Sequence, residues 1–164
     1  MPINLELKIM VESHQPLRRK LIDIGAESRG ILNQKDVYYT VQEGLLKLRI
    51  ENGNESLIFY RRDEKAESRW SDYDVIKFEN GGGENFLKKI FSVETVVEKK
   101  RELYYHENTR IHFDEVKSLG NFVELETLVL KGKADAKLRF EKVRNILDLD
   151  ISKQIRKSYR DLLI

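Results

Sequence analysis

Asn4-Leu5-Glu6-Leu7-Lys8-Ile9 is a stretch of the chain in which polar and apolar side chains alternate without a break. Side chains of a β-strand point alternately to its two faces. Asn4, Glu6 and Lys8 therefore share one face of the predicted strand, and apolar side chains cover the other. The stretch predicts a strand with charges of both signs on one face and a face suited to burial on the other.

The same alternation recurs in later stretches, which are Lys47-Leu48-Arg49-Ile50, Lys99-Lys100-Arg101, Arg110-Ile111-His112-Phe113-Asp114 and Phe122-Val123-Glu124-Leu125-Glu126-Thr127-Leu128. A charged face is ordinary for an antiparallel sheet in contact with solvent, where opposite charges form weak cross-strand pairs. If the strands instead share one enclosed polar face, that face carries many cations and fewer carboxylates. Such a face could hold a polyanion together with a metal ion.

The length and composition of the chain limit its class. With 164 residues it can bury a substantial core, and we expect residues 1–164 to form one domain. The 30 basic and 28 acidic residues leave a net charge of +2, which gives no support for a nucleic-acid or membrane surface. The absence of cysteine excludes disulfides, thiolate zinc sites and cysteine nucleophiles, and no apolar run approaches the roughly 20 residues that span a bilayer. We therefore expect a soluble, cytoplasmic protein.

Periodicity and turn residues predict about eight strands and several helices. Besides the first strand, we expect strands over Val37–Val41, Leu45–Glu51, Ser56–Arg62, Trp70–Phe78, Thr95–Tyr105, Thr109–Val116 and Phe122–Leu130. Helices are expected over Ser13–Gly25, in a short segment carrying Phe86, Leu87, Ile90 and Phe91, over Lys133–Leu147, and in a final helix through Ile151, Ile155, Tyr159 and Leu162. The apolar stripe of the first helix can pack on the apolar face of the sheet. Asn52-Gly53-Asn54 predicts a hairpin turn, and Asp63–Arg69 a charged loop.

The residues of the polar face suggest a specific chemistry. A phosphate chain needs several cations along its length, which Lys8, Lys47, Arg49, Arg61, Lys99 and Arg101 could provide. Magnesium and manganese ions prefer hard oxygen ligands, which Glu6, Asp114, Glu124 and Glu126 could provide. The neighbouring carboxylates of Glu124 and Glu126 repel each other, and their repulsion calls for a cation.

Other catalytic classes find little support. The chain has no Gly-x-Ser-x-Gly motif, and the three histidines lack metal-ligand spacing, which argues against a serine hydrolase and a histidine zinc site. We expect His112 to be a hydrogen-bonded wall residue rather than an acid or base. No Gly-Lys-Ser or Gly-Lys-Thr follows Gly81–Gly83, so that run is not a Walker loop. Packing is the favoured role, ahead of stacking on a base, for Tyr38, Tyr39, Tyr60, Trp70 and Tyr73.

An ordered set of motifs resembles the CYTH superfamily, the triphosphate tunnel metalloenzymes that include class IV adenylyl cyclases and thiamine triphosphatases. Asn4-x-Glu6-x-Lys8 is similar to the Glu-x-Glu-x-Lys signature of that superfamily. The resemblance continues through Gln34–Tyr39, Leu46–Arg49, Tyr60–Arg62, Val97–Arg101, Arg110–Val116, Leu119–Glu126 and Ser158–Leu163. It spans nearly the whole chain and is closest to the class IV adenylyl cyclase branch.

The resemblance implies an α+β fold in which eight antiparallel strands close into a β-barrel, the triphosphate tunnel, with helices packed outside. It implies that the triphosphate is bound by Lys8, Lys47, Arg49, Arg61, Lys99 and Arg101, and that Mg2+ or Mn2+ is held by Glu6, Glu124 and Glu126. Glu6, Lys8 and Asp114 would be catalytic, with Asp114 orienting a cation or assisting the metal. The family usually has lysine at the position of Arg61, and Arg62 is close enough in register to line the tunnel instead. Arg110 would be an additional wall cation.

Asn4 departs from the signature, because a neutral amide is a weaker partner for a divalent ion than the glutamate it replaces, so a second metal site is less well supported. The resemblance favours an adenylyl cyclase that converts ATP to cyclic AMP and pyrophosphate. The alternatives are a triphosphatase acting on thiamine triphosphate, a nucleoside triphosphate or tripolyphosphate, a non-catalytic triphosphate-binding or polyphosphate-binding module, and a structural barrel whose inner charges only pair. No nucleic-acid or membrane partner is expected, and a homodimer is compatible with the resemblance.

Overall fold

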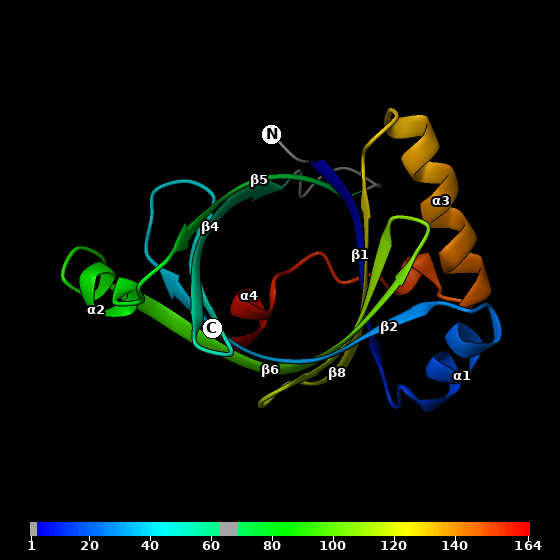
Figure 1. The fold of residues 1–164 in the computed structure, drawn as a ribbon, viewed down its shortest axis with the longest axis horizontal. Coiled ribbons are helices and arrows are strands. Elements are labelled where there is room, and N and C mark those ends of the chain that lie inside the picture. The colour runs from blue at the N-terminus through cyan, green and yellow to red at the C-terminus, as the bar shows by residue number, and fades with distance from the viewer. Residues whose placement is uncertain (1–2, 63–68) are drawn as a thin grey trace.

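Eight strands close into one antiparallel barrel in the computed structural model, which describes the backbone of residues 3–62 and 69–164 (Figure 1). The side chains of residues 62 and 69–71 lie outside the description. The order around the barrel is β1-β5-β4-β3-β2-β6-β7-β8. The strands are β1 (Ile3–Val11), β2 (Glu27–Tyr39), β3 (Leu45–Glu51), β4 (Asn54–Arg62), β5 (Arg69–Phe78), β6 (Val93–His106), β7 (Thr109–Val116) and β8 (Gly120–Leu128). The predicted closed eight-stranded barrel is confirmed. The charged loop predicted over Asp63–Arg69 lies, apart from Arg69, outside the described residues.

Helices connect or follow the strands on the outside and at one end of the barrel. They are α1 (Gln15–Asp23), α2 (Gly83–Lys88), α3 (Lys133–Ile146) and α4 (Tyr159–Leu163), with a 3-10 turn η1 (Ile151–Lys153). Within residues 3–62 and 69–164, each helix is too short or too polar to cross a lipid bilayer.

The barrel wall is polar inside and apolar outside where α1 and α3 cover it. Leu5 and Leu7 of β1 belong to one buried cluster with Leu21 of α1 and Phe140 of α3. Figure 1 shows both helices on the same outer side of the ring of strands. Burial of the apolar face under helices leaves the opposite face of the alternating strands to line the interior. The predicted packing of the first helix on the sheet is confirmed.

The short helix α2 covers part of the other side of the barrel, away from α1 and α3 (Figure 1). Its buried Leu87 packs with Tyr39 of β2 and Leu48 of β3. The hairpin between β3 and β4 turns at Asn52 and Gly53, whose φ angles are 50° and 81°. Two consecutive positive φ angles match the right-handed twist of a hairpin, and the predicted Asn-Gly turn is confirmed.

The predicted strand over Val37–Val41 was wrong in both bounds. β2 runs from Glu27 to Tyr39 and pairs with β6 along nearly all of that length. Residues 27–36 are largely polar and many are exposed, so they carry no alternating apolar signal. A register shift between Ser28 and Ile31 interrupts the pattern further. The strand is specified by its partner β6 rather than by its own composition.

The single final helix predicted through residues 151–162 was also wrong. η1 ends at Lys153, the backbone is extended at Gln154, and α4 begins only at Tyr159. The backbone N–H of Ile155 donates to the carbonyl of Lys8 in β1 at 2.8 Å. This bond ties the segment to the barrel and replaces the helical bonds that the apolar spacing predicted. The helix restarts at Ser158, whose hydroxyl accepts from a backbone N–H of α4.

The C-terminal segment closes one end of the barrel. Tyr159 of α4 lies in a buried cluster with Tyr38 of β2, Val97 of β6 and Phe122 of β8. Ser158 and Tyr159 also line the cavity inside the barrel. Figure 1 shows α4 within the outline of the ring of strands. The interior is therefore a pocket with a floor built by the C-terminal segment.

Candidate functional site

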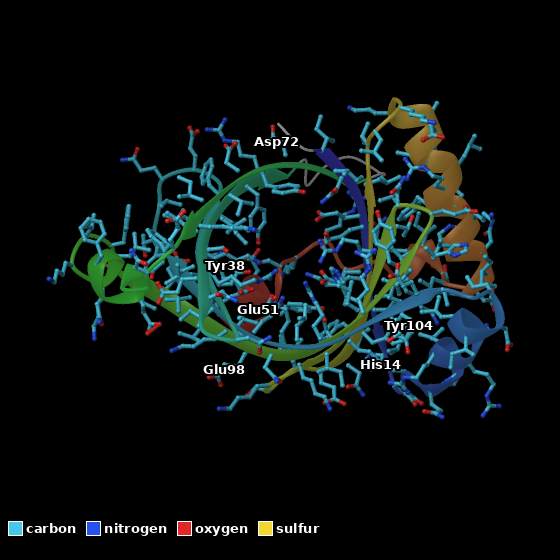
Figure 2. The ribbon with its side chains drawn as sticks, viewed as in Figure 1. His14, Tyr38, Glu51, Asp72, Glu98 and Tyr104 are labelled. Atoms are coloured by element: carbon cyan, nitrogen blue, oxygen red, sulfur yellow. The ribbon has the colours of Figure 1, made fainter. Side chains whose placement is uncertain are left out.

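The barrel encloses a cavity of about 220 Å³. Its charged lining residues are Lys8, Lys47, Arg49, Lys99, Arg101, Arg110, Glu6, Glu124 and Glu126, and its other lining residues are Asn4, Tyr38, Ile58, Tyr60, Tyr73, Val75, Ser158 and Tyr159. Figure 2 shows Tyr38 inside the ring of strands, whereas Asp72 and Glu98 lie outside it. The structure therefore brings together every predicted site residue except Arg61 and Asp114.

The register of the strands explains why charges far apart in the sequence meet. Glu6 and Lys8 of β1 lie opposite Glu126 and Glu124 of β8. His112 of β7 lies opposite Glu124 from the other side. Directly opposite residues share a face, so three adjacent strands present their charges to the same part of the interior.

Asp36 of β2 is fully buried and bonds to three cations. Its carboxylate accepts hydrogen bonds from Lys47 at 3.1 Å, from Lys99 at 2.9 Å, and from Arg49 through two bonds of 2.8 Å. Burial alone would raise the pKa of Asp36, but the three cations lower it well below its usual value. Asp36 is therefore ionised at neutral pH and holds the three cations in one group, the Asp36 cluster (Asp36, Lys47, Arg49 and Lys99).

The two lysines of the Asp36 cluster have lowered pKa values, which a bound anion would raise again. Burial lowers the pKa of Lys47 well below its usual value and also lowers the pKa of Lys99, and the positive charge of Arg49 acts in the same direction. A bound anion would oppose both effects, because a nearby negative charge favours the ammonium form. The cluster consequently gains more from a bound phosphate chain than exposed lysines would.

Arg101 of β6 is bonded to two carboxylates. It donates to Asp114 at 2.7 and 2.8 Å and to Glu124 at 2.5 Å. The hydroxyl of Tyr159 donates to the same Asp114 carboxylate at 2.7 Å. Burial would raise the pKa of Glu124, but Arg101 lowers it well below its usual value.

The catalytic role predicted for Asp114 needs a correction. The side chain of Asp114 is fully buried behind Arg101 and does not line the cavity. Both oxygens of its carboxylate accept from Arg101, and one also accepts from Tyr159. This geometry matches the other half of the prediction, in which Asp114 orients a cation. The contacts of Asp114 thus fix the direction of the Arg101 guanidinium.

The carboxylates gather at β1 and β8. Glu6 lies opposite Glu126, and Nδ1 of His112 is 3.5 Å from Glu124 Oε1 and 3.7 Å from Glu126 Oε1. Burial and the charge of Arg101 lower the pKa of His112, so the imidazole is neutral at neutral pH. Carboxylate oxygens are the ligands that Mg2+ and Mn2+ prefer. The donor set of Glu6, Glu124 and Glu126 therefore fits the divalent ion that the sequence predicted.

Lys8 stands between the carboxylates and the C-terminal floor of the cavity. Its ammonium donates to the backbone carbonyl of Lys157 at 2.9 Å and is 3.9 Å from Glu124 Oε2. It also lies 4.2 Å from the ring centroid of Tyr159. The C-terminal segment thus fixes the direction in which this cation points.

Asn4 and four neighbours form the less charged part of the cavity wall. Asn4 is buried and lines the cavity together with Tyr73. Tyr73 and Val75 of β5 line the cavity beside Ile58 and Tyr60 of β4, and these four residues are here called the β4–β5 wall. The structure thus places an apolar and aromatic surface next to the charged groups. Tyr39 packs on the outside against Phe91, and the side chain of Trp70 lies outside the described residues.

The prediction that Arg61 lines the tunnel is wrong. Its side chain is 64% exposed on the outer surface and 3.8 Å from Glu43. Tyr60 lines the cavity, and the alternation of β4 turns the next side chain outward. The side chain of Arg62 lies outside the described residues. Arg110, the additional cation predicted for the wall, lines the cavity.

Sequence reasoning assigned no role to Asp36 or Tyr159. Asp36 precedes the predicted start of its strand at Val37, so no face was assigned to it. Had β2 been extended towards Gln34, the parity shared with Tyr38 would have placed Asp36 on the polar face. The spacing of Tyr159 indicates one apolar position of a helix, and no local signal reveals its bond to Asp114.

A larger groove of about 660 Å³ is lined by residues of β2, β3, β6, β7 and β8 near the β3–β4 and β7–β8 turns, and it shares Lys99 with the inner cavity. Its charges have both signs, and Glu98 and Lys117 pair there at 3.1 Å with both side chains substantially exposed. Exposed pairs of this kind contribute little and are common on protein surfaces. The inner cavity, with its buried cations and carboxylates, is the candidate site.

Comparisons with known proteins find relatives over nearly the whole chain. A protein of Methanocaldococcus jannaschii, named as a candidate adenylate cyclase, is 26% identical over an alignment of 171 positions that covers 98% of each chain. The PH1012 protein of Pyrococcus horikoshii has a similar structure, with a TM-score of 0.79 at 24% identity, over 97% of this chain and 98% of that one. A candidate adenylyl cyclase of Hippeastrum, described as having a dominant triphosphatase activity, aligns with a TM-score of 0.65 at 15% identity over 91% of this chain and 89% of its own. The CYTH domain model matches residues 2–159, and with this match across almost its whole length the chain belongs to the CYTH domain family.

Proposed function

We propose that this protein is a metal-dependent enzyme acting on an organic triphosphate, with the conversion of ATP to cyclic AMP and pyrophosphate as the favoured reaction. The observation that carries the proposal is a single cavity in which the Asp36 cluster and Arg101 lie near Glu6, Glu124 and Glu126. The cations suit a phosphate chain, and the carboxylates suit an ion bound to that chain. The similarity to the Methanocaldococcus protein favours the cyclase reaction. A cytoplasmic location is also proposed, which the lack of cysteine supports.

The charge balance of the cavity supports a metal ion in addition to the triphosphate. Among the described residues, six cations and three carboxylates line the cavity, and Asp36 and Asp114 lie behind the cations. With Asp36 and Asp114 included there are five carboxylates, one fewer than the six cations. A triphosphate carries more negative charge than this surplus can neutralise, and a divalent ion would offset part of the difference. The site is therefore better suited to a metal–triphosphate complex than to the bare anion.

The residues of the chain would act mainly by positioning and by charge neutralisation. Lys47, Arg49 and Lys99, held together by Asp36, would bind the phosphate chain. Arg101, held by Asp114, would stabilise negative charge that develops as pyrophosphate leaves. In the cyclase reaction the ribose 3′ hydroxyl oxygen bonds to the α-phosphorus, the bond from that phosphorus to pyrophosphate breaks, and the hydroxyl proton is released to water. The divalent ion, bound by Glu6, Glu124 and Glu126, would supply further charge neutralisation.

The β4–β5 wall supports an organic triphosphate over inorganic tripolyphosphate. Ile58, Tyr60, Tyr73 and Val75 offer apolar and aromatic surface within the same cavity as the cations. An inorganic polyphosphate has no group that would use such a surface. A nucleoside or another flat organic group could pack there, because aromatic side chains stack on bases.

Hydrolysis is the second candidate, because the cations and carboxylates of the cavity would serve a triphosphatase equally well. In that reaction the oxygen of water bonds to the terminal phosphorus, the bond from that phosphorus to the organic diphosphate breaks, and the diphosphate and orthophosphate are the products. The Hippeastrum protein, described as having a dominant triphosphatase activity on this fold, supports the alternative.

Product analysis separates the candidates. The purified protein is incubated with ATP, thiamine triphosphate or tripolyphosphate in the presence of Mg2+ or Mn2+, and the products are resolved by chromatography. Cyclic AMP with pyrophosphate is the expected result from ATP, whereas orthophosphate from any substrate would identify a triphosphatase. Tight binding without a product would identify a binding module. Absence of binding to all three compounds would contradict a triphosphate site in the cavity.

Substitution of Tyr73 tests whether the β4–β5 wall binds the organic group. Tyr73→Ala is expected to raise the KM for ATP about tenfold, since stacking on a base contributes roughly 1–3 kcal/mol, and to leave tripolyphosphate binding nearly unchanged. Tyr73→Phe should keep most of the ATP affinity because it retains the ring. Ile76→Ala, on the outer face of the same strand and 61% exposed, is the matched control. An equal loss for ATP and tripolyphosphate would contradict this role.

A further inference from the structure

His112 faces the carboxylates of the candidate site from the centre of β7. Its side chain is 1% exposed, and its Nδ1 atom is 3.5 Å from Glu124 Oε1 and 3.7 Å from Glu126 Oε1. One donor atom from each of the three side chains lies within 4.8 Å of the other two. A nitrogen donor thus stands beside two oxygen donors in a group compact enough to surround one ion.

The hydrogen bonding of His112 is too weak to explain its burial. Its contact with Glu124 lies at the outer limit for a hydrogen bond, well beyond the usual 2.7–3.2 Å. The other ring nitrogen, Nε2, is buried and has no hydrogen-bond partner in the described part of the chain. Buried polar atoms nearly always have partners, so neither nitrogen of this buried ring has the strong hydrogen bond that is usual for such a group. An ion bound at Nδ1 would give the buried ring a strong interaction.

The distances suit an ion between the side chains. Adjacent ligands of an octahedral ion with bonds of about 2.1 Å lie about 3.0 Å apart. The distances from His112 Nδ1 to Glu124 Oε1 and to Glu126 Oε1 exceed this by about 0.5 and 0.7 Å, which small side-chain movements can close. Glu124 Oε1 already accepts from Arg101, but a carboxylate oxygen has two lone pairs and can do both.

We propose that His112 is a direct nitrogen ligand of the divalent ion held by Glu124 and Glu126, and that this ligand makes the site selective for Mn2+ over Mg2+. The inference rests on the proposed function, which places a divalent ion at these carboxylates. Imidazole suits transition-metal ions, whereas Mg2+ is bound almost entirely through oxygen. Asn4 acts in the same direction, because its neutral amide leaves the cavity with one fewer carboxylate than the family signature would supply.

Electron paramagnetic resonance of bound Mn2+ tests the nitrogen ligand without any substrate. The wild-type protein is titrated with Mn2+ alone, and pulsed spectra are recorded for nitrogen coupling to the ion. We expect one bound Mn2+ per chain with a clear nitrogen coupling. His112→Gln should lose the coupling and weaken Mn2+ binding about tenfold or more, and Mg2+ binding, measured by competition, should change much less.

Two controls keep the test independent of folding. His106→Gln, at the partly exposed end of β6, removes a different imidazole and should retain the coupling. Wild-type protein labelled with nitrogen-15 histidine should show the coupling pattern of the heavier isotope. This control requires no amino-acid substitution. Circular dichroism checks that His112→Gln is folded.

The outcomes separate this inference from the proposed function. Bound Mn2+ without nitrogen coupling, in protein that turns over a triphosphate, would overturn the His112 ligand and leave the function standing. Nitrogen coupling in protein that neither binds nor turns over any triphosphate would support the ligand and contradict the function. Absence of Mn2+ binding, with and without tripolyphosphate, would contradict both.

Discussion

Replacement of Asp36 by alanine is expected to lower the free energy of unfolding by about 3–5 kcal/mol, the usual cost of removing one partner from a buried ion pair. Asp36 is fully buried and is the shared partner of Lys47, Arg49 and Lys99. Without it, the three cations remain close together with no carboxylate between them, and they repel one another. Urea denaturation at neutral pH measures the change.

A surface pair provides the matched control for Asp36→Ala. Glu98 pairs with Lys117 at 3.1 Å, but the two side chains are 49% and 75% exposed. Glu98→Ala should therefore change the free energy of unfolding by less than about 1 kcal/mol. Equal effects of the two substitutions would contradict a stabilising role for the buried cluster. Added tripolyphosphate should stabilise Asp36→Ala, because the anion supplies the negative charge that the variant lacks.

The contribution of Asp36 also depends on pH. Its pKa is lowered in the folded protein, relative to about 3.9 in an unfolded chain. A carboxyl whose pKa is lower in the folded state stabilises the protein at pH values above its unfolded-state pKa. That stabilisation is lost as the pH falls towards the folded-state pKa. The advantage of the wild-type protein over Asp36→Ala should thus be complete at neutral pH and shrink below about pH 4. An advantage that stays constant down to pH 3 would contradict this assignment.

Replacement of Arg101 by alanine is expected to produce the largest loss of activity, a reduction in kcat/KM of about 100-fold to 1,000-fold, as for removal of a preorganised donor in other enzymes. Arg101 lines the cavity and is held by two bonds to Asp114 and one to Glu124. Its loss removes a cation from the site and also leaves the buried Asp114 and the 13% exposed Glu124 without their main partner. The free energy of unfolding should fall by about 3–5 kcal/mol as well. Steady-state kinetics and urea denaturation measure the two effects.

Two further variants separate the loss of charge from the loss of geometry. Arg101→Lys keeps the positive charge but cannot form the paired bonds to Asp114, so it should recover stability better than activity. Arg61→Ala removes a cation that the sequence predicted as a ligand but that lies on the outer surface. It should leave kcat/KM unchanged and the free energy of unfolding within about 0.5 kcal/mol. A loss of activity in Arg61→Ala that matched Arg101→Ala would contradict the assignment of both residues.

Much of the fold was predictable because local patterns agreed with the tertiary structure. The alternation around Glu6 and Lys8 identified a strand with one polar face, and β3, β4 and β7 were placed within one or two residues of their bounds. The long strand β2 was not predictable in the same way, because its polar first half depends on pairing with β6. The final helix failed for a related reason, since a bond from Ile155 to β1 competes with local helical spacing.

The residues of the candidate site also divide into those that local patterns predicted and those whose positions depend on tertiary contacts. Lys47, Arg49, Lys99, Arg101, Glu124 and Glu126 were all predicted, and all line one cavity. Arg61 and Asp114 were misplaced, one by the parity of β4 and the other by burial behind Arg101. Asp36, which holds three of the predicted cations, was missed because its own strand was predicted to begin one residue later.

The sequence by itself determined which side chains share a face, because alternation along a strand depends only on the order of residues. It therefore determined that a polar face with both cations and carboxylates exists, and the resemblance to the CYTH superfamily implied that this face turns inward. Only the tertiary structure decided which charges meet. Pairing of Arg101 with Asp114 and Glu124, the three cations around Asp36, and the approach of His112 to two carboxylates all depend on strand register and burial. Electrostatic interactions depend on distance and on exclusion of water, and neither is encoded in the local order of residues.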